Sequence, residues 1–239
     1  MNSCMRKIFL LLLLLLTLAL WAPAQNLVPN PGFEIRSGCP SAPGQFRLVD
    51  SWISPNNGSP DYFNECSISM DFGTEFNRKG GQPAHDGQGY AGIQSENLNR
   101  NEFYEYIQTR LTEPLKAGTE YCIRIFVSRG NSNDALAELG AVLSQTQVKS
   151  TNPAKMNLPY VSLKENAPLE DSERWVCLSN LYRAKGGEQY LTIGDFSVAD
   201  VFVRLAEVTA KDSLFRIAYY FIDDVSVEIA DSTVRCRCD

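Results

Sequence analysis

The stretch from Ala218 to Ile229 constrains the fold of this chain of 239 residues more than any other. Its sequence, AYYFIDDVSVEI, alternates between two faces with a period of two and is rich in β-branched and aromatic residues, as in a half-buried β-strand. One face carries Tyr219, Phe221, Asp223, Val225, Val227 and Ile229, and the other Tyr220, Ile222, Asp224, Ser226 and Glu228. We therefore predict a β-sandwich that is closed by this last strand.

Asp223 interrupts the apolar face of the predicted strand. An unpaired carboxylate on a buried face is costly, so Asp223 should have a partner. The candidates are a metal ion, several backbone N–H groups, or an arginine such as Arg36 or Arg124. Asp224 points the other way and is expected in solvent, although a local bulge would exchange the two roles.

Residues 1–24 have the pattern of a secretory signal peptide. Arg6 and Lys7 precede an apolar run over residues 8–20, and Ala22-Pro23-Ala24 is a small-residue cleavage site. The run is short for a stable membrane span, although an uncleaved anchor is the alternative. The mature chain is expected to begin near Gln25 and to be exported to the periplasm, the cell surface or the extracellular medium.

The charge of the mature chain argues against two classes of partner. Removal of residues 1–24 leaves 20 basic and 28 acidic side chains, a net charge of −8. Nucleic acid and an anionic membrane surface are therefore not expected as partners. No second long apolar run follows, so we predict no transmembrane segment after signal cleavage, one domain over residues 25–230, and a short tail over 231–239.

Six cysteines remain after cleavage, and an even number in an exported protein indicates disulfides. Zinc is disfavoured because C-x-x-C pairs are absent and His85 is the only histidine. We predict a Cys39–Cys66 bond, since both flank a loop region, and a Cys122–Cys177 bond between adjacent strands. Cys236 and Cys238 are left open, with a small ring or a partner on another chain as the alternatives.

Short strands with turn signals between them predict an all-β fold of the jelly-roll β-sandwich class, because helix-sized amphipathic segments are missing. Residues 52–66 and the glycine-rich run that follows them are expected to be loops. The strands expected before the last one cover residues 90–93, 103–111, 121–128, 139–144, 175–182, 188–196 and 201–206.

Six segments in this order resemble a known family: NLVPNPGFE, SPDYFNEC, GYAG, EYIQTRLTEPLKAGTEYC, GGEQYLTIGDF and YYFIDDVSV. Together they are similar to an N-terminal domain of envelope proteins of gliding and related Gram-negative bacteria, often followed by an OmpA-like domain. More distantly, the first and last segments and PLKAGTEYCIRIFVS resemble carbohydrate-binding modules with the galactose-binding jelly-roll fold. The chain stops at Asp239 without an OmpA-like domain, so cell-wall anchoring is not implied.

The distant resemblance also implies a structural calcium ion. In such modules the N-terminal segment lies beside the last strand, and an ion there is held by carboxylate and backbone oxygens. Carried over, Glu34 and Asp223 would supply side-chain oxygens, and nearby loops would supply carbonyls.

The predicted ligand site is an aromatic platform in the loops. Trp52 and Tyr62, with Asp61 and Asn64 as hydrogen-bonding neighbours, match the composition of sites that bind sugar rings. The alternative is that Trp52 and Phe63 plug the end of the sandwich.

We predict a non-catalytic module that binds glycan or another envelope component. A structural or protein-interaction module is the competing class, and a glycoside hydrolase, which needs two facing acids, is the other. An esterase is disfavoured because Phe196 follows Asp195 in the GDFS segment, where the serine nucleophile would stand.

Overall fold

The computed structural model describes residues 25–98, 101–197, 202–205, 216–230 and 236–238. The predicted signal peptide and most of the predicted tail lie outside these residues. Strands form two main sheets, and every strand pair is antiparallel. This confirms the all-β jelly-roll sandwich class.

The smaller main sheet has the order β1 (Trp52–Ile53), β5 (Ile107–Arg110), β11 (Tyr190–Gly194), β8 (Leu139–Ser144) and β9 (Val161–Leu163). The larger has the order β10 (Val176–Arg183), β6 (Glu120–Arg129), β13 (Arg216–Ile229), β3 (Gly89–Leu98) and β2 (Asp61–Asn64), with β4 (Asn101–Tyr104) paired to β3. β7 (Asp134–Leu136) pairs with β12 (Phe202–Arg204), and a 3-10 turn, η1, spans Gln45–Leu48.

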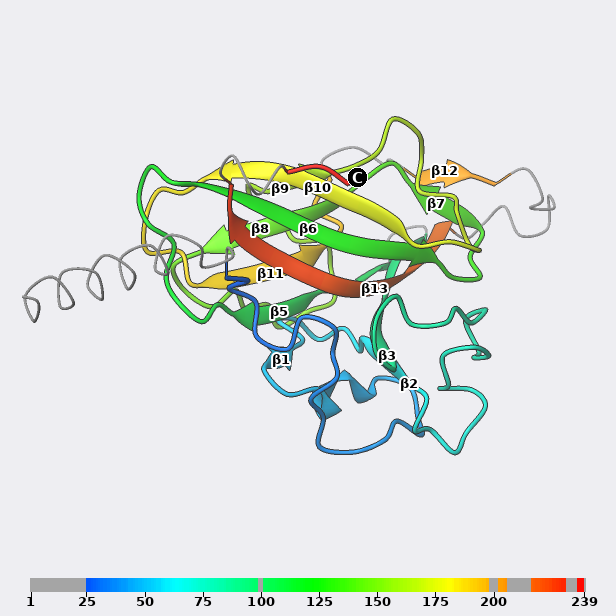
Figure 1. Cartoon of the computed structure of the whole chain (residues 1–239). Coiled ribbons are helices and arrows are strands. Elements are labelled where there is room, and N and C mark those ends of the chain that lie inside the picture. Colours follow the sequence, from blue (N-terminus) through cyan, green and yellow to red (C-terminus); the bar gives the residue numbers. More distant parts are fainter. Residues whose placement is uncertain (1–24, 99–100, 198–201, 206–215, 231–235, 239) are drawn as a thin grey trace, which may run out of the picture.

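The last strand lies in the middle of its sheet. Figure 1 shows β13 flanked by β6 in front of β5, β8 and β11, with the loops of the first third of the chain gathered beside β2 and β3. The N-terminal segment lies beside β13, because the Leu27 N–H donates to the Val227 carbonyl over 2.9 Å. This placement agrees with the one that the resemblance implied.

A bulge in β13 changes which face meets the main core. Its register against β6 shifts between Asp223 and Ser226, and Asp224 has a left-handed φ of 46°. Tyr220 and Ile222 point into the main core before the bulge, and Val225 and Val227 point there after it. The single apolar face predicted for this strand is therefore wrong: its first half faces a separate aromatic cluster of Phe63, Phe72, Tyr90, Tyr219 and Phe221.

The strands differ from the prediction at several positions: β3 extends to Leu98, and the short strands β1, β7 and β9 were not predicted. The strand expected over residues 103–111 is split into β4 and β5, because buried Glu105 leaves the ladder and accepts hydrogen bonds from the Ser59 and Gln94 N–H groups. Residues 61–64, expected in a loop, form β2, whose four side chains are all buried.

The disulfides confirm one predicted pair and correct the other. Cys39 is bonded to Cys66 as predicted. Cys122 is bonded to Cys236 and Cys177 to Cys238, so the predicted Cys122–Cys177 bond is wrong. Register is the reason: Cys122 lies opposite Leu181, and Cys177 lies opposite Phe126, four residues further along β6.

Candidate functional site

The structure brings the four predicted ligand-binding residues close to the core but does not expose them. Trp52 is 2% exposed, Asp61 6%, and Tyr62 and Asn64 0%. The Tyr62 hydroxyl donates to the Phe33 carbonyl over 3.0 Å and accepts the Asn64 amide over 2.9 Å. These side chains do not form the exposed platform that we expected.

Trp52 belongs to an aromatic cluster under the N-terminal loops. Its ring lies 5.0 Å from Phe33 and 6.4 Å from Phe46 between centroids. Its indole N–H donates to the Asn30 carbonyl over 3.0 Å. Trp52 therefore plugs the sandwich, as the alternative interpretation proposed.

The outer face of the five-stranded sheet is the candidate ligand-binding surface. Thr109 and Leu191 are paired and point inward with Trp52, so their neighbours Gln108, Arg110 and Tyr190 point outward. A polar outer face on an otherwise apolar sheet is available for hydrogen bonding to a ligand.

Gln108 is the unusual residue of this face. It is 0% exposed, and its amide N–H groups donate to Thr192 Oγ1 over 2.7 Å and to the Val148 carbonyl over 3.4 Å. Its Oε1 has no hydrogen-bond partner within the part of the chain that the structure describes. A buried amide oxygen without a donor is costly, and a donor group on a ligand would remove this cost.

The segment over residues 145–160 crosses the same face and divides it. Its backbone is fixed by the Ser150 N–H, which donates to the Pro55 carbonyl over 2.8 Å, and the Met156 N–H, which donates to the Tyr106 hydroxyl over 3.0 Å. Two pockets adjoin this segment, and Gln147 lines both of them.

The pocket beside β1 and β5 has a volume of about 250 Å³. It is lined by Ser51, Trp52, Ile53, Gln108, Thr109, Arg110, Gln147 and Tyr190. Two aromatic side chains, an aliphatic side chain, two amides, two aliphatic hydroxyls and a cation thus share one small cavity. Such a lining suits a polar ring with apolar faces.

The pocket beside β8 and β9 has a volume of about 470 Å³. Its lining includes Tyr160, Tyr182 and Lys185, with Ser144, Thr146 and Gln147 as polar neighbours. Tyr160 donates to Glu138 over 2.5 Å and Tyr182 donates to Glu188 over 2.7 Å, which fixes both rings. Burial, together with the Glu138 carboxylate, raises the pKa of Tyr160 to about 12.

Carboxylates do not line either pocket. Burial opposes ionisation of Glu188, but hydrogen bonds from Tyr182 and from the Lys185 and Gly186 N–H groups outweigh it and lower the pKa of this carboxyl. Two facing acids, which glycoside hydrolysis requires, are therefore not offered by these two cavities.

The two predicted calcium ligands are brought together around Gly32. A Cβ on Gly32 would lie 3.6 Å from Oδ1 of Asp223, 3.6 Å from Oδ1 of Asp224, and 3.9 Å from Cγ of Glu34. Gly87, at a left-handed φ of +69°, allows the backbone to approach, because a Cβ there would meet Glu34 Oε1 at 2.5 Å. The carboxylates of Asp223 and Asp224 therefore lie beside Gly32 where the N-terminal loop meets the bulge, while the Glu34 carboxylate is directed toward Gly87.

Backbone N–H groups already satisfy part of this carboxylate cluster. Asp223 accepts the N–H groups of His85 and Asp224 over 2.9 and 2.8 Å, and Glu34 accepts those of Gln88 and Gly89, both over 2.8 Å. Burial, and secondly the charge of Asp224, raise the pKa of Asp223 to about 8.

A histidine also contacts this cluster of carboxylates, but the side chains present do not complete the coordination of a metal ion. His85 Nδ1 contacts the Asp224 carboxylate, so a basic group also faces the cluster. Among the described residues, no group of three or more His, Cys, Asp or Glu side chains is placed to hold a metal ion. Calcium would therefore need carbonyl oxygens or water in addition.

The sequence did not single out Gln108, Gln147 or Tyr190. The only signal for Gln108 and Arg110 is their alternation with Ile107 and Thr109 along one strand, which is shared by any half-exposed strand. Gln147 lies in a segment with no regular structure, so its position over the sheet could not be deduced from spacing.

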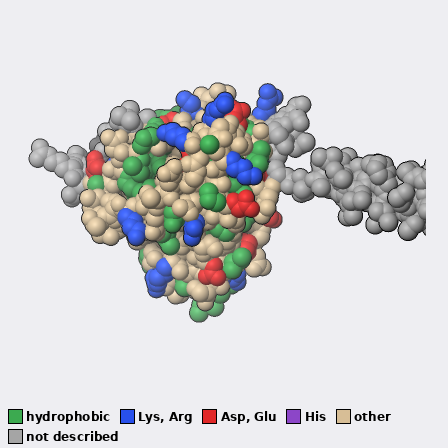
Figure 2. Space-filling model, turned by 90° about the vertical axis from the view of Figure 1, so that its left-hand side faces the viewer, with side chains coloured by type: hydrophobic (Ala, Val, Ile, Leu, Met, Phe, Trp, Pro, Cys, Tyr) green, Lys and Arg blue, Asp and Glu red, His purple; other side chains and the backbone are tan. Residues whose placement is uncertain are grey.

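Figure 2 shows the end of the molecule that lies at the left in Figure 1. Basic and acidic side chains are interspersed there with hydrophobic ones, and are not gathered into a patch of one sign. None of the helical turns in the described ranges is long and apolar enough to cross a membrane.

No family model and no curated protein sequence matches the chain. Solved structures with a similar arrangement of strands include the CBM22-1 xylan-binding domain of Xyn10C from Paenibacillus barcinonensis, with 12% identity and a TM-score of 0.44 over 87% of this chain and 97% of that one. The K3 cleaved adhesin domain of Lys-gingipain from Porphyromonas gingivalis has 16% identity and a TM-score of 0.39, over 86% and 98% of the two chains.

A third similar structure comprises the CBM22-1 and GH10 modules of xylanase 10B from Clostridium thermocellum in complex with xylohexaose. It has 14% identity and a TM-score of 0.43 over 89% of this chain, which spans only 30% of that one. TM-scores below 0.5 do not establish a common fold, so the fold described above rests on the strand pairing, and these likenesses carry no information on ligands.

Proposed function

We propose that this protein is an exported, non-catalytic module that binds a glycan on the outer face of its five-stranded sheet. The unpartnered Oε1 of Gln108, buried beside a pocket with Tyr190, Gln147 and Arg110, is the observation that carries this proposal. Three disulfides support export, because such bonds persist in oxidising compartments.

The chemistry of the two pockets suits a saccharide chain. Tyrosine rings offer apolar surfaces for the faces of sugar rings, while amides and hydroxyls offer hydrogen bonds to their rims. Because Gln147 lines both pockets, a chain of several sugar units would reach from one to the other. The partner is then a glycan of the cell envelope or of the surroundings.

Replacement of Tyr190 by alanine should weaken glycan binding by about 5- to 30-fold, since loss of one stacked ring costs on the order of 1–2 kcal/mol. The purified protein is first applied to a glycan array, and the best glycan is then titrated by calorimetry. Phe76→Ala, on a different loop, is the matched control and should bind normally. The proposed function would be refuted if the protein bound no glycan on the array. It would also be refuted if both variants and the wild type bound the best glycan with equal affinity.

We also propose a structural calcium ion between the N-terminal loop and β13. Glu34 and Asp223, and with them Asp224, would supply carboxylate oxygens; the two aspartates lie beside Gly32, and the Glu34 carboxylate lies beside Gly87. Such an ion would compensate the charge of the buried Asp223 carboxylate, and it would stabilise the fold without a catalytic role.

Calcium at about 100 times its Kd should stabilise the protein by about 2.7 kcal/mol relative to EDTA, because it binds the folded state only. Thermal unfolding in calcium and in EDTA measures the difference. Asp223→Asn should abolish this difference, whereas Asp86→Asn, an exposed neighbour, should keep it. Identical midpoints of the wild type in calcium and EDTA, with no calcium found by elemental analysis, would exclude the ion.

A further inference from the structure

A third pocket lies in the loop after β2, away from the outer face of the five-stranded sheet. It has a volume of about 390 Å³ and is lined only by residues between Glu65 and Phe76. The loop is held in place at its start by the Cys39–Cys66 disulfide and in its middle by Phe72, which is buried in the smaller aromatic cluster. The pocket is therefore built on a fixed backbone.

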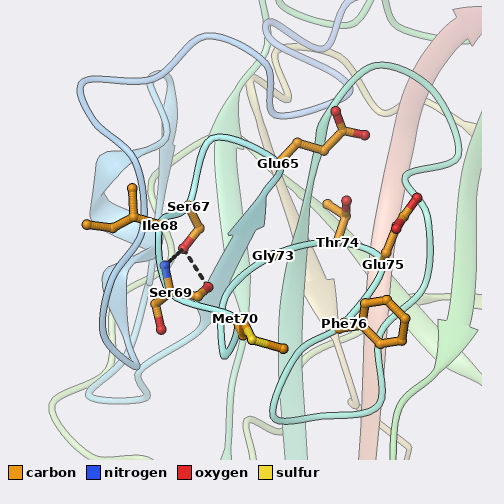
Figure 3. Close-up of a pocket in the computed structure, with 9 residues that line it drawn as sticks. All are labelled: Glu65, Ser67, Ile68, Ser69, Met70, Gly73, Thr74, Glu75 and Phe76. Atoms are coloured by element: carbon orange, nitrogen blue, oxygen red, sulfur yellow. Dashed lines mark hydrogen bonds between the residues drawn. The ribbon is translucent and has the colours of Figure 1, made fainter.

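The apolar part of this pocket is exposed to a degree that is unusual for such side chains. Met70 is 80% exposed and Phe76 69%, and Ile68 beside them is 99% exposed. Figure 3 shows Met70 and Phe76 on the same side of the pocket. Exposed apolar side chains that gather at one site indicate contact with a partner.

The polar part of the pocket has one sign of charge. Glu65 and Glu75 are exposed, none of the lining residues is basic, and neither glutamate forms an ion pair within the described ranges. Figure 3 shows Thr74 between these two glutamates.

Thr74 provides an independent sign of a missing ligand. Its side chain is 2% exposed, and its Oγ1 has no hydrogen-bond partner among the described residues. The backbone carbonyl of the same residue is satisfied, since it accepts the Gln82 N–H over 2.8 Å and the Tyr90 hydroxyl over 3.0 Å. A buried hydroxyl that lines a pocket and lacks a partner favours a ligand that donates or accepts a hydrogen bond there.

We propose that this pocket binds an arginine side chain, flanked by apolar residues, of a protein partner. The guanidinium would stack on Phe76 and donate to the carboxylates of Glu65 and Glu75, and the flanking residues would cover Met70 and Ile68. Arginine fits better than lysine because its planar group stacks on aromatic rings and presents five donors. Charge complementarity selects a basic segment, since the pocket itself holds only acids.

The test uses two peptides that differ only in charge. Acetyl-Leu-Arg-Leu-amide and its citrulline analogue, which has the same shape without the charge, are titrated into the ¹⁵N-labelled protein and followed by NMR. The arginine peptide should shift the amide signals of residues 65–76, and the citrulline peptide should bind at least about tenfold more weakly, because it lacks charge-assisted hydrogen bonds.

The variant Glu65→Gln/Glu75→Gln should bind the arginine peptide about tenfold more weakly than the wild type does, because it removes both carboxylates and keeps the side-chain shape. Glu113→Gln/Glu165→Gln, at exposed sites outside the pocket, is the matched control and should bind as the wild type does. Equal affinity for both peptides, shifts outside the loop, or no effect of the double variant would overturn the proposal. Glycan binding by these variants should be unchanged, so the two sites can be tested separately.

Discussion

Replacement of both Cys122 and Cys236 by alanine should lower the free energy of unfolding by about 5 kcal/mol in the chain-entropy model of disulfides. The bond closes a loop over a sequence separation of 114 residues, the largest of the three. For a domain of this size the melting temperature should fall by roughly 10–20 °C. Thermal and denaturant unfolding of the oxidised protein measure both quantities.

The bond between Cys39 and Cys66 provides an internal comparison. It closes a loop over a separation of only 27 residues, so its removal should cost about 3.5 kcal/mol. The test is which of the two double variants loses more free energy of unfolding. The comparison is fair because both variants lose one disulfide and gain two alanines. A larger loss in Cys39→Ala/Cys66→Ala, or a peptide map with Cys122 joined to Cys177, would contradict the pairing described here.

The pairing of Cys122 could not be deduced from sequence, because it depends on strand register. Both β6 and β10 were predicted and do pair, but an offset of four residues separates Cys122 from Cys177 by about 13 Å along the strands. Cys236 and Cys238, only two residues apart, reach the two adjacent strands instead. Spacing along the chain does not report this arrangement.

Strand positions were predicted better than the faces of those strands. The alternation in β13 located the strand, but the bulge at Asp223 and Asp224 adds a residue and reverses the inward face. Period-two reasoning assumes an uninterrupted ladder. The same reasoning correctly anticipated backbone N–H groups as one kind of partner for Asp223, since His85 and Asp224 donate to it.

The expected exposure of Trp52 and Tyr62 was wrong because composition does not distinguish an exposed aromatic residue from a buried one. Trp52 and Tyr62 stand among Asn, Asp, Ser and Gly, as residues of a sugar site do, yet the N-terminal loops cover both. Gln108 and Tyr190 became candidates only when the sheet and the segment over residues 145–160 were in place, because they lie far apart in the chain.

Replacement of Tyr62 by alanine should therefore destabilise the fold by about 4 kcal/mol, the cost of deleting a large buried aromatic side chain. Tyr62 is 0% exposed, and its hydroxyl bonds to the Phe33 carbonyl and the Asn64 amide. An exposed glycan platform would give the opposite result: weaker binding with an unchanged melting temperature. Thermal unfolding and glycan titration of the same variant separate the two cases.

Tyr62→Phe isolates the contribution of the hydroxyl in this prediction. The ring and its packing stay, but the Phe33 carbonyl and the Asn64 amide each lose a partner, so the expected cost is about 1–3 kcal/mol. Tyr190→Phe is the matched control on the outer face, where a half-exposed ring should change stability by no more than about 0.5 kcal/mol. If Tyr62→Ala has the same melting temperature as the wild type, the side chain is not part of the core, and the buried position described here is wrong.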